Sequence, residues 1–441
     1  MRLFTQLASL ACCAAMLPAC EREPPRTAGP LPHDIYVWQR VWTPAVRAGL
    51  QESSPSISQF VVLAAQISVS SQPGITRVPL DYPSLAATGK PVGLAIRISP
   101  FSGPFRTGDD HARAIVELAL ERIANSRARG LEPSELQIDF DCAESKLGGY
   151  QLWLRAIQKA VHPLPVSPTV LPSWLKHSAF AALAQESGRF VLQVHSVDPP
   201  RTVSGARRLT DPNRARAWVE EAGRLGVPFR VALPTYTYLA AFDRAGNPLG
   251  VSAEAESSAW PSDAHVVRWE SDPAELAELV ASWTRNRPAA MTGLIWYRLP
   301  VATDALNWRW VTLAAVMKGD VPRRCLRVEA TGAEPMDLMV INDGEQDEPL
   351  PRTIDAQWND ARLTAADALG AYARASGDGQ RLNSLRFEQT NGTTLSRLRP
   401  GERHTIGWIR CEPPVPIRLS IPRAADPRNS TEPASPVRDG F

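Results

Sequence analysis

The chain has 441 residues, of which 21% are charged, and its formal net charge is only +2. Such a length exceeds that of an ordinary single domain and fits one barrel-type domain with a smaller companion. The balanced charge offers no extended basic field, so we do not expect nucleic acid as a partner.

Residues 1–19 are predicted to be a secretory signal peptide. After Arg2 they form an uncharged, mostly apolar stretch that is too short to span a bilayer in the mature protein. The segment Leu17-Pro18-Ala19-Cys20 resembles the bacterial lipobox, which implies cleavage before Cys20 and lipidation of that cysteine. A plain signal peptide with a chance cysteine is the alternative. By the same resemblance, Glu21 favours the outer membrane, so we expect a periplasm-facing lipoprotein whose lipid is its only membrane attachment.

Residues 20–32 are rich in proline and are predicted to be a semi-extended tether. Three cysteines follow, at positions 142, 325 and 411. In an oxidising periplasm the simplest pairing joins Cys325 to Cys411, since both lie in strand-like runs near the carboxyl terminus. Two unpaired thiols are the alternative. Cys142 then stands alone and lacks the partners that a zinc site needs.

Eight short apolar runs recur between His33 and Pro300, and their spacing predicts the fold. Helical segments at 109–130, 148–161, 212–226 and 272–286 separate several of them. Alternating strands and helices imply parallel pairing through right-handed crossovers. We therefore predict an α/β fold with a (β/α)8 TIM-type barrel over residues 33–320. The runs are DIYVWQRVW, FVVLAAQIS, VGLAIRIS, LQIDFDC, LPVSPTVLP, FVLQVHSV, FRVALPTYTY and GLIWYRLP.

Two further regions depart from this repeat. Residues 238–254 contain a Gly-Asn-Pro turn between short apolar runs and are predicted to form a hairpin beside the barrel mouth. From residue 321 to 423, short alternating runs separated by turn residues predict a small all-β sandwich-like accessory domain. Residues 424–441 are polar and rich in proline, which predicts a disordered tail.

The fourth run, ELQIDFDCAES, carries the candidate catalytic residues. Alternate strand residues share a face, so Asp139 and Asp141 lie together, with their Cα atoms about 6.5–7 Å apart. Glu144 follows in the loop at the carboxyl end of the strand, where barrel enzymes hold their reacting groups. Glycoside hydrolysis needs one protonated carboxyl and a second group that supports the anomeric centre. We expect burial and the neighbouring aspartates to raise the pKa of Glu144 so that it acts as the acid.

Polar and aromatic side chains at the other strand ends predict a sugar site. Aromatic faces cover the apolar side of pyranose rings, while charged groups satisfy the hydroxyls. Gln193 also lies at a strand end. The residues predicted to bind substrate are Trp38, Gln39, Arg40, Gln66, Arg97, His195, Tyr236, Tyr238, Trp296, Tyr297 and Arg298.

The segment from Asp139 to Glu144 resembles the fourth-strand signature of family 18 glycoside hydrolases, in which alternating aspartates lead to a catalytic glutamate. The family's glutamate stands two residues after the last aspartate, whereas Glu144 stands three after Asp141, and Leu136 occupies the place of the first aspartate. The resemblance therefore implies the strand position and the clustered carboxylates, without the N-acetyl-assisted mechanism. The lipobox, the first and fourth runs and the trailing β-domain together are similar to a bacterial family catalogued as domain of unknown function 3142. That similarity implies a barrel and no particular reaction.

Structural roles for the same residues stay open. Asp139 and Asp141 could pair with Arg97 or Arg40 inside the barrel, and Glu144 could be an exposed loop acid. His195 and the tyrosines could be wall residues, and the tryptophans could cap the core.

We therefore carry several functional hypotheses. The first is a lipid-anchored, glycan-active envelope enzyme of the glycoside hydrolase type, acting as a monomer without cofactor or resident metal. The alternative is a non-catalytic lipoprotein that binds a polysaccharide or an envelope protein. A third is a metal-dependent hydrolase that uses Asp139, Asp141, Glu144 and His195.

Overall fold

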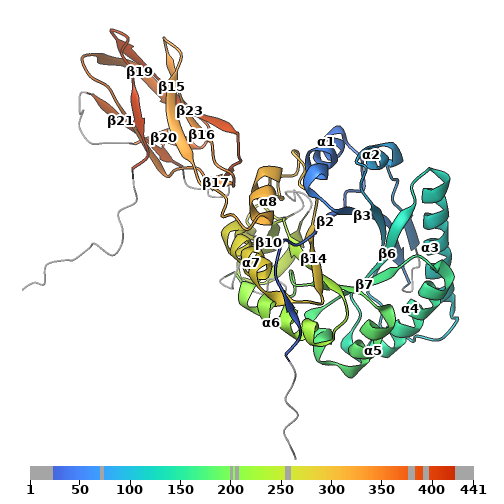
Figure 1. Cartoon of the computed structure of the whole chain (residues 1–441). Helices are drawn as coiled ribbons and strands as arrows, with labels where there is room; N and C mark the ends of the chain where they lie inside the picture. The colour runs from blue at the N-terminus through green and yellow to red at the C-terminus, as the bar shows by residue number, and fades with distance from the viewer. Residues whose placement is uncertain are drawn as a thin grey trace, which may run out of the picture.

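The computed structural model describes residues 23–69, 74–198, 202–203, 208–253, 260–375, 383–390 and 397–422. They form a closed barrel followed by a separate domain of β-strands (Figure 1). The predicted signal peptide, Cys20 and the tail at 424–441 lie outside the described residues. Within the described ranges, no helix is long and apolar enough to cross a bilayer.

Eight parallel strands close the barrel, which confirms the predicted fold class. Each strand pairs with its neighbours along the chain, and the first and last strands also pair, so the sheet has no open edge. A short antiparallel strand, β4 (Gly74–Arg77), extends the second barrel strand. The barrel strands are β2 (His33–Val37), β3 (Gln59–Ser68), β5 (Val92–Ile98), β6 (Pro133–Phe140), β7 (Val166–Val170), β8 (Phe190–Gln193), β9 (Phe229–Pro234) and β14 (Met291–Tyr297).

Helices surround this barrel (Figure 1), and capping residues explain where several of them begin. Thr43, Asp81, Asp109, Asp211 and Asp272 each accept a hydrogen bond from a backbone N–H of the first turn, which satisfies a donor that the helix itself leaves free. The helices are α1 (Pro44–Ser53), α2 (Tyr82–Ala87), α3 (Asp110–Ala128), α4 (Leu147–Val161), α5 (Ser178–Ser187), α6 (Pro212–Arg224), α7 (Pro273–Arg285) and α8 (Trp310–Met317), with 3-10 turns η1 (Ser54–Ser56), η2 (Glu144–Lys146) and η3 (Pro172–Lys176).

Strand β6 shows how alternation divides the side chains between the two faces of the barrel wall. Leu136, Ile138 and Phe140 are buried in the main core, between the strands and the helices. Glu135 and Gln137 alternate with them and point into the barrel, where they contact residues of other strands. The pattern places Asp139 on the same inward row.

A buried ion pair network fills the amino-terminal end of the barrel. Arg230 lies 2.7 Å from both Asp34 and Glu135, and Gln59 and Ser167 donate further hydrogen bonds to Glu135. Burial tends to raise the pKa of Glu135, but Arg230 and the hydrogen bonds outweigh it and leave that pKa lowered. Burial dominates at Asp34, whose pKa rises to about 6. Arg230 therefore compensates Glu135, whereas Asp34 stays a buried carboxyl with a raised pKa.

Part of the predicted tether is in fact packed against the barrel. Strand β1 (Arg26–Thr27) pairs with β13 (Arg287–Pro288), and Arg26 forms an ion pair with Glu220 at 2.6 Å. Leu31 is buried. This correction has a simple physical cause, since Leu31 offers apolar area to the core and β13 offers backbone partners that composition alone does not reveal.

The predicted hairpin is confirmed as part of a three-stranded insertion sheet. This sheet consists of β10 (Tyr238–Phe242), β11 (Pro248–Ser252) and β12 (His265–Trp269), with β10 in the middle. It leaves the barrel directly after β9, at the carboxyl end of the strands. The insertion sheet therefore lies beside the barrel mouth.

The β-domain consists of two four-stranded antiparallel sheets with their own apolar core, as the sequence predicts. One sheet has the order β15-β16-β23-β19 and the other β20-β21-β18-β24, while β17 pairs with β22. The strands are β15 (Leu326–Thr331), β16 (Met336–Asn342), β17 (Glu348–Pro349), β18 (Thr353–Gln357), β19 (Arg362–Ala368), β20 (Tyr372–Arg374), β21 (Ser384–Gln389), β22 (Arg397–Leu398), β23 (Arg403–Glu412) and β24 (Arg418–Ser420).

The predicted disulfide between Cys325 and Cys411 is wrong, because both cysteines are free. Cys325 lies at the Asn342 end of β16, where its carbonyl accepts from Asp343. Cys411 lies beyond the Met336 end of the same strand. The six residue steps between these ends span about 20 Å, whereas the two Cα atoms of a disulfide lie roughly 4.4–6.8 Å apart.

Replacing Arg230 tests the buried network. We expect Arg230→Met to lower the free energy of unfolding by about 3–5 kcal/mol, because it leaves buried carboxylates without their cation. Arg189→Met is the matched control: Arg189 is exposed at the same end of the barrel and should change stability by less than about 0.5 kcal/mol. Urea unfolding measures both, and equal effects of the two substitutions would contradict the prediction.

Candidate active site

A cavity of about 170 Å³ lies at the mouth of the barrel, among the carboxyl ends of the strands. It brings together eight of the residues predicted from the sequence, which are Trp38, Arg97, Asp139, Asp141, His195, Tyr236, Tyr238 and Tyr297. Five others line it as well: Tyr36, Thr169, Gln193, Ser196 and Ala232. We call this space the mouth cavity.

Asp139 lies between two side chains of neighbouring strands. Arg97 is its register partner on β5, with Nη1 3.8 Å from the carboxylate, and Thr169 on β7 donates a hydrogen bond to Oδ1 at 2.8 Å. Only 15% of the Asp139 side chain is exposed. Burial raises the pKa of Asp139, and the nearby charge of Asp141 raises it further. Arg97 and the hydrogen bond from Thr169 act in the opposite direction but do not outweigh these effects. The arginine therefore does not neutralise this carboxyl.

Asp141 differs from Asp139 in its environment. It follows the last residue of β6, lines the mouth cavity and is exposed. The two aspartates thus present one enclosed and one open carboxyl to a single space. Acid–base pairs are built from such differences in environment.

A polar cluster forms the opposite wall. Nδ1 of His195 lies 3.4 Å from both Ser196 Oγ and the Tyr236 hydroxyl, and those two oxygens are hydrogen-bonded to each other. The Tyr236 hydroxyl also donates to Tyr238 at 3.3 Å. Burial lowers the pKa of His195 to about 3, so the imidazole is neutral at ordinary pH. Ser196 has φ of 54°, a left-handed conformation that is costly for a residue with a side chain and often found at functional sites.

Aromatic rings join this wall to the first strand. Tyr297 lies edge-on to Trp38, Tyr36 and Tyr236 with centroid distances of 5.3, 5.8 and 5.4 Å, and its ring stacks near His195 at 5.7 Å. Such contacts fix ring positions and leave an apolar surface with hydroxyls at its edge. The surface suits a ligand that has both apolar faces and polar groups.

Glu144 lies outside the mouth cavity. It opens η2, its side chain is 44% exposed, and Oε2 lies 2.9 Å from Nε2 of His177. Hydrogen bonds from Ser173 and His177 lower the pKa of Glu144, which is the opposite of the predicted increase. Its partners are in the segment before α5, so the predicted acid faces a neighbouring loop.

Five predicted substrate-binding residues also lie elsewhere. Trp296 is fully buried on the outward face of β14 and donates to Nδ1 of His33 at 3.1 Å. Arg298 forms a buried ion pair with Asp304 at 2.5 Å. Gln39 donates to the carbonyl of Leu299, and Arg40 donates to Gln66; none of these three side chains is among those that line the mouth cavity. Successive residues of a strand point to opposite faces, so Trp296 faces outward because Tyr297 faces into the barrel.

Two sequence families cover most of the described chain. Residues 88–302 match the family described as Domain of unknown function (DUF3142). Residues 327–412, within the β-domain, match the description Domain of unknown function (DUF8456). No curated protein matches the chain.

Solved structures with a similar shape are distant in sequence. The spore cortex-lytic enzyme SleL of Bacillus cereus is 11% identical, with a TM-score of 0.47 over 66% of this chain and 75% of that one. A chitinase from Chromobacterium violaceum is 15% identical, with a TM-score of 0.42 over 66% and 98%. The GH18 chitinase ChiB of Flavobacterium johnsoniae is 8% identical, with a TM-score of 0.43 over 66% and 94%. These similarities assign no role to any residue of the DUF3142 barrel.

The sequence analysis missed some residues at the barrel mouth, although the strand positions of two of them could have revealed them. Tyr36 precedes Trp38 by two residues and therefore shares its face, and Thr169 occupies the inward position at the end of β7. Ser196 had no such signal, because it lies beyond β8 in an irregular turn. Three of the proposed metal ligands, Asp139, Asp141 and His195, line the mouth cavity, whereas Glu144 lies outside it. Among the residues that the structure describes, no group of three His, Cys, Asp or Glu side chains is arranged to hold an ion.

The raised pKa of Asp139 predicts how stability varies with pH. The folded pKa lies above the unfolded one, so the folded state binds the proton more tightly and Asp139 stabilises the fold less as pH rises through these values. Asp139→Asn removes this dependence. The melting temperature of the variant, relative to wild type, should therefore increase as the pH rises above the ordinary aspartate pKa of about 4.

Thr169→Val sharpens the same test. It removes a hydrogen bond to the ionised carboxyl, so the loss of stability with rising pH should become steeper in this variant. Scanning calorimetry across the pH range measures all three proteins. A constant difference between Asp139→Asn and wild type would show that the carboxyl is not perturbed.

Proposed function

We propose that the mouth cavity binds a glycan and that Asp139 and Asp141 hydrolyse one of its glycosidic bonds. The observation that carries this proposal is the pair of carboxyls in unlike environments at the carboxyl ends of the barrel strands. Barrel enzymes hold their reacting groups at that face. Hydrolysis of a glycoside requires a proton donor and a second carboxyl, and the two aspartates are the candidates that share the cavity.

The environments suggest which aspartate does what. Because burial raises the pKa of Asp139, this residue is the better proton donor to the leaving oxygen. Asp141 is open to the ligand and supports the positive charge that develops at the anomeric carbon. A water molecule then adds to that carbon, and the proton that it loses returns to Asp139. Neutral His195 and the tyrosine hydroxyls then bind sugar hydroxyls, and the ring of Tyr297 or Trp38 covers an apolar sugar face.

A second candidate is a barrel that binds the glycan without cleaving it. The placement of Glu144 favours this reading, since the longest acidic side chain of the segment is held by His177 outside the cavity. The position two residues after Asp141 is Ala143, which has no proton to give. Both candidates use the same mouth, so they differ only in turnover.

Substitutions at the two carboxylates separate the candidates. We expect Asp141→Asn to reduce hydrolysis by about 100-fold or more while leaving the melting temperature nearly unchanged, because Asp141 is exposed. Glu144→Gln is the matched control from the same segment and should retain full activity. Release of reducing ends from periplasmic glucans and peptidoglycan fragments measures turnover.

Titration of the same glycans completes the experiment. Binding by wild type with no reducing ends released supports the non-catalytic candidate. Full activity of Asp141→Asn, or loss of activity in Glu144→Gln alone, contradicts the assignment of the pair. If wild-type protein neither binds nor cleaves any of these glycans, the proposal is wrong.

We also propose that the protein is anchored in the bacterial envelope by lipid on Cys20 and faces the periplasm. The support is the segment from Leu17 to Cys20 after an apolar leader. Cys20→Ala should abolish incorporation of an alkyne-tagged fatty acid and release the protein from the membrane fraction. Cys13→Ala, inside the leader, should leave labelling intact, and equal labelling of both variants would exclude the anchor.

A further inference from the structure

The chain joins the barrel at the amino-terminal end of the strands, opposite the mouth. The carbonyl of Pro25 accepts a hydrogen bond from the backbone of Ala289 at 2.6 Å, and β1 pairs with β13 directly before β14 begins. The ion pair between Arg26 and Glu220 of α6 holds the same segment, which lies beside α6 in Figure 1. The point from which the chain extends toward Cys20 is therefore fixed at this end of the barrel.

The remaining tether has a short reach. Cys20 precedes Pro25 by five residues, and five residues of fully extended chain cover at most about 18 Å. The barrel is taller than this, because the 19 residues of α3 alone span about 28 Å. A lipid on Cys20 therefore keeps the amino-terminal end of the barrel close to the bilayer. The tether cannot run the height of the barrel, so the mouth cannot turn to face the membrane.

Exposed cations gather at the same end of the barrel. Each of the four consecutive helices α4 to α7 carries one in its last turn or just beyond its end, namely Lys159, Arg189, Arg224 and Arg285. Among the residues that the structure describes, none of the four forms an ion pair or donates a side-chain hydrogen bond. The helix dipole favours a cation at this position but does not neutralise it. We call these four residues the basic face.

Acidic side chains do not cancel the charge of the basic face. In the last turns of the same helices Glu186 is paired with Arg155, and within the described ranges Glu221 is the carboxylate that has no such partner. At the mouth end Asp211 and Asp272 cap α6 and α7. The barrel is thus polarised, with unpaired cations near the tether and carboxylates near the mouth, although the net charge of the chain is only +2.

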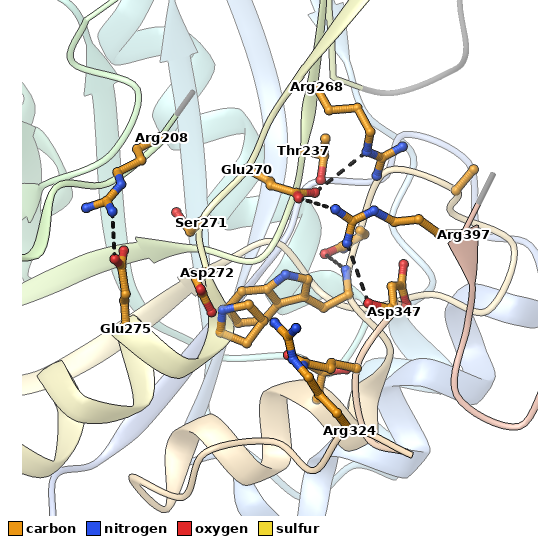
Figure 2. A pocket seen from close by; sticks show the side chains of 16 residues that line it. Arg208, Thr237, Arg268, Glu270, Ser271, Asp272, Glu275, Arg324, Asp347 and Arg397 are labelled. Atoms are coloured by element: carbon orange, nitrogen blue, oxygen red, sulfur yellow. Dashed lines mark hydrogen bonds and ion pairs between the residues drawn. The ribbon is translucent and has the colours of Figure 1, made fainter. Parts of the chain in front are cut away.

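The β-domain is attached at the opposite end from the basic face. Arg397 of β22 lies 2.6 Å from Glu270, which follows β12 of the insertion sheet, and Figure 2 shows Arg268 directed at the same carboxylate. Arg309, at the start of α8 and hence also at the mouth end, pairs with Glu402 at 3.0 Å. The contacts that fix the β-domain therefore lie away from the basic face.

We propose that the basic face contacts anionic phospholipid headgroups of the membrane that holds the protein, so that the mouth opens away from the bilayer. This inference rests on the lipid anchor at Cys20 that is proposed above. Each Lys or Arg near an anionic membrane surface strengthens binding by about fivefold. Such contacts are weak and are screened by salt, so the lipid is still needed for stable attachment. The basic face sets the orientation of the anchored barrel.

This orientation restricts the ligand of the mouth cavity. The mouth stands about 28 Å from the headgroups, which is the length of α3. A glycan that reaches the mouth must extend well beyond the membrane surface, as an envelope polymer does. The sugar headgroup of a membrane lipid does not extend that far.

Hydrogen exchange of the wild-type protein, purified from membranes and placed on vesicles, tests the orientation. Vesicles of phosphatidylcholine are compared with vesicles that also contain phosphatidylglycerol. With phosphatidylglycerol we expect slower exchange in the connections before β7, β8, β9 and β14, loss of this protection at high salt, and no change at 141–146 by the mouth. Protection at the mouth instead would overturn the orientation. Equal exchange on both kinds of vesicle would overturn the contact with anionic lipid.

A triple substitution tests the named cations. Lys159→Gln, Arg189→Gln and Arg224→Gln together should weaken the contact with phosphatidylglycerol vesicles by about 100-fold, because three fivefold contributions are lost. The protection seen in wild type should therefore disappear. Unchanged protection in a folded triple variant would contradict the proposal.

The matched control removes the same charge from the β-domain. Arg352, Arg410 and Arg418 are exposed there, and their combined replacement by glutamine should leave the protection as in wild type. Melting temperatures show whether both triple variants are folded. Equal loss of protection in the two would mean that net charge, and not the basic face, controls the contact.

Flotation separates this proposal from the lipid anchor. Wild-type protein that does not float with phosphatidylcholine vesicles carries no anchor, which would contradict the lipid at Cys20. Binding to phosphatidylglycerol vesicles at low salt, lost in the triple variant of the basic face, would then still support the contact. Absence of that binding would overturn it.

Discussion

The alternation of β6 within a closed barrel is the constraint on which the rest of the structure depends. It sends Glu135, Gln137 and Asp139 into a space that water hardly enters, so each acid there requires compensation. At the amino-terminal end Arg230 supplies it at 2.7 Å. At the mouth the nearest cation, Arg97, stays 3.8 Å from Asp139, and burial prevails. One strand therefore holds a neutralised carboxyl at its start and a perturbed one at its end.

The two ends are physically connected. Glu135 accepts from the Gln137 amide, and Gln137 in turn accepts from the Tyr36 hydroxyl at 2.6 Å, while the ring of Tyr36 lines the mouth cavity. The buried network thus fixes one aromatic wall of the candidate site. A rigid scaffold positions functional side chains. Replacing Arg230 should consequently shift side chains at the mouth as well as lower the free energy of unfolding.

The sequence allowed us to predict the features that depend on the periodicity of strands and helices. The barrel, the insertion hairpin and the inward row of β6 all follow from strand and helix repeats, and most of the strand-end residues that share one inward face meet at the mouth. It failed where orientation depends on distant partners. Glu144 is held by a histidine 33 residues away, and Cys325 and Cys411 are separated by a strand order that no spacing reveals. Trp296 and Tyr297 could not both face inward, so a prediction that took whole strand ends without regard to alternation included Trp296 wrongly.

The contrast between the two ends also bears on function. A carboxyl that is enclosed, loosely paired and raised in pKa destabilises the fold at neutral pH, whereas an apolar residue or asparagine at position 139 would not. The same barrel pairs Glu135 closely with Arg230 and lowers its pKa, although burial raises the pKa of Asp34 beside the same arginine to about 6. Perturbed groups concentrate at sites that do chemistry or bind ligands. Ion pairing thus accounts for Arg230 and Glu135, while the looser pairing of Asp139 at the mouth supports the ligand that we propose for that cavity.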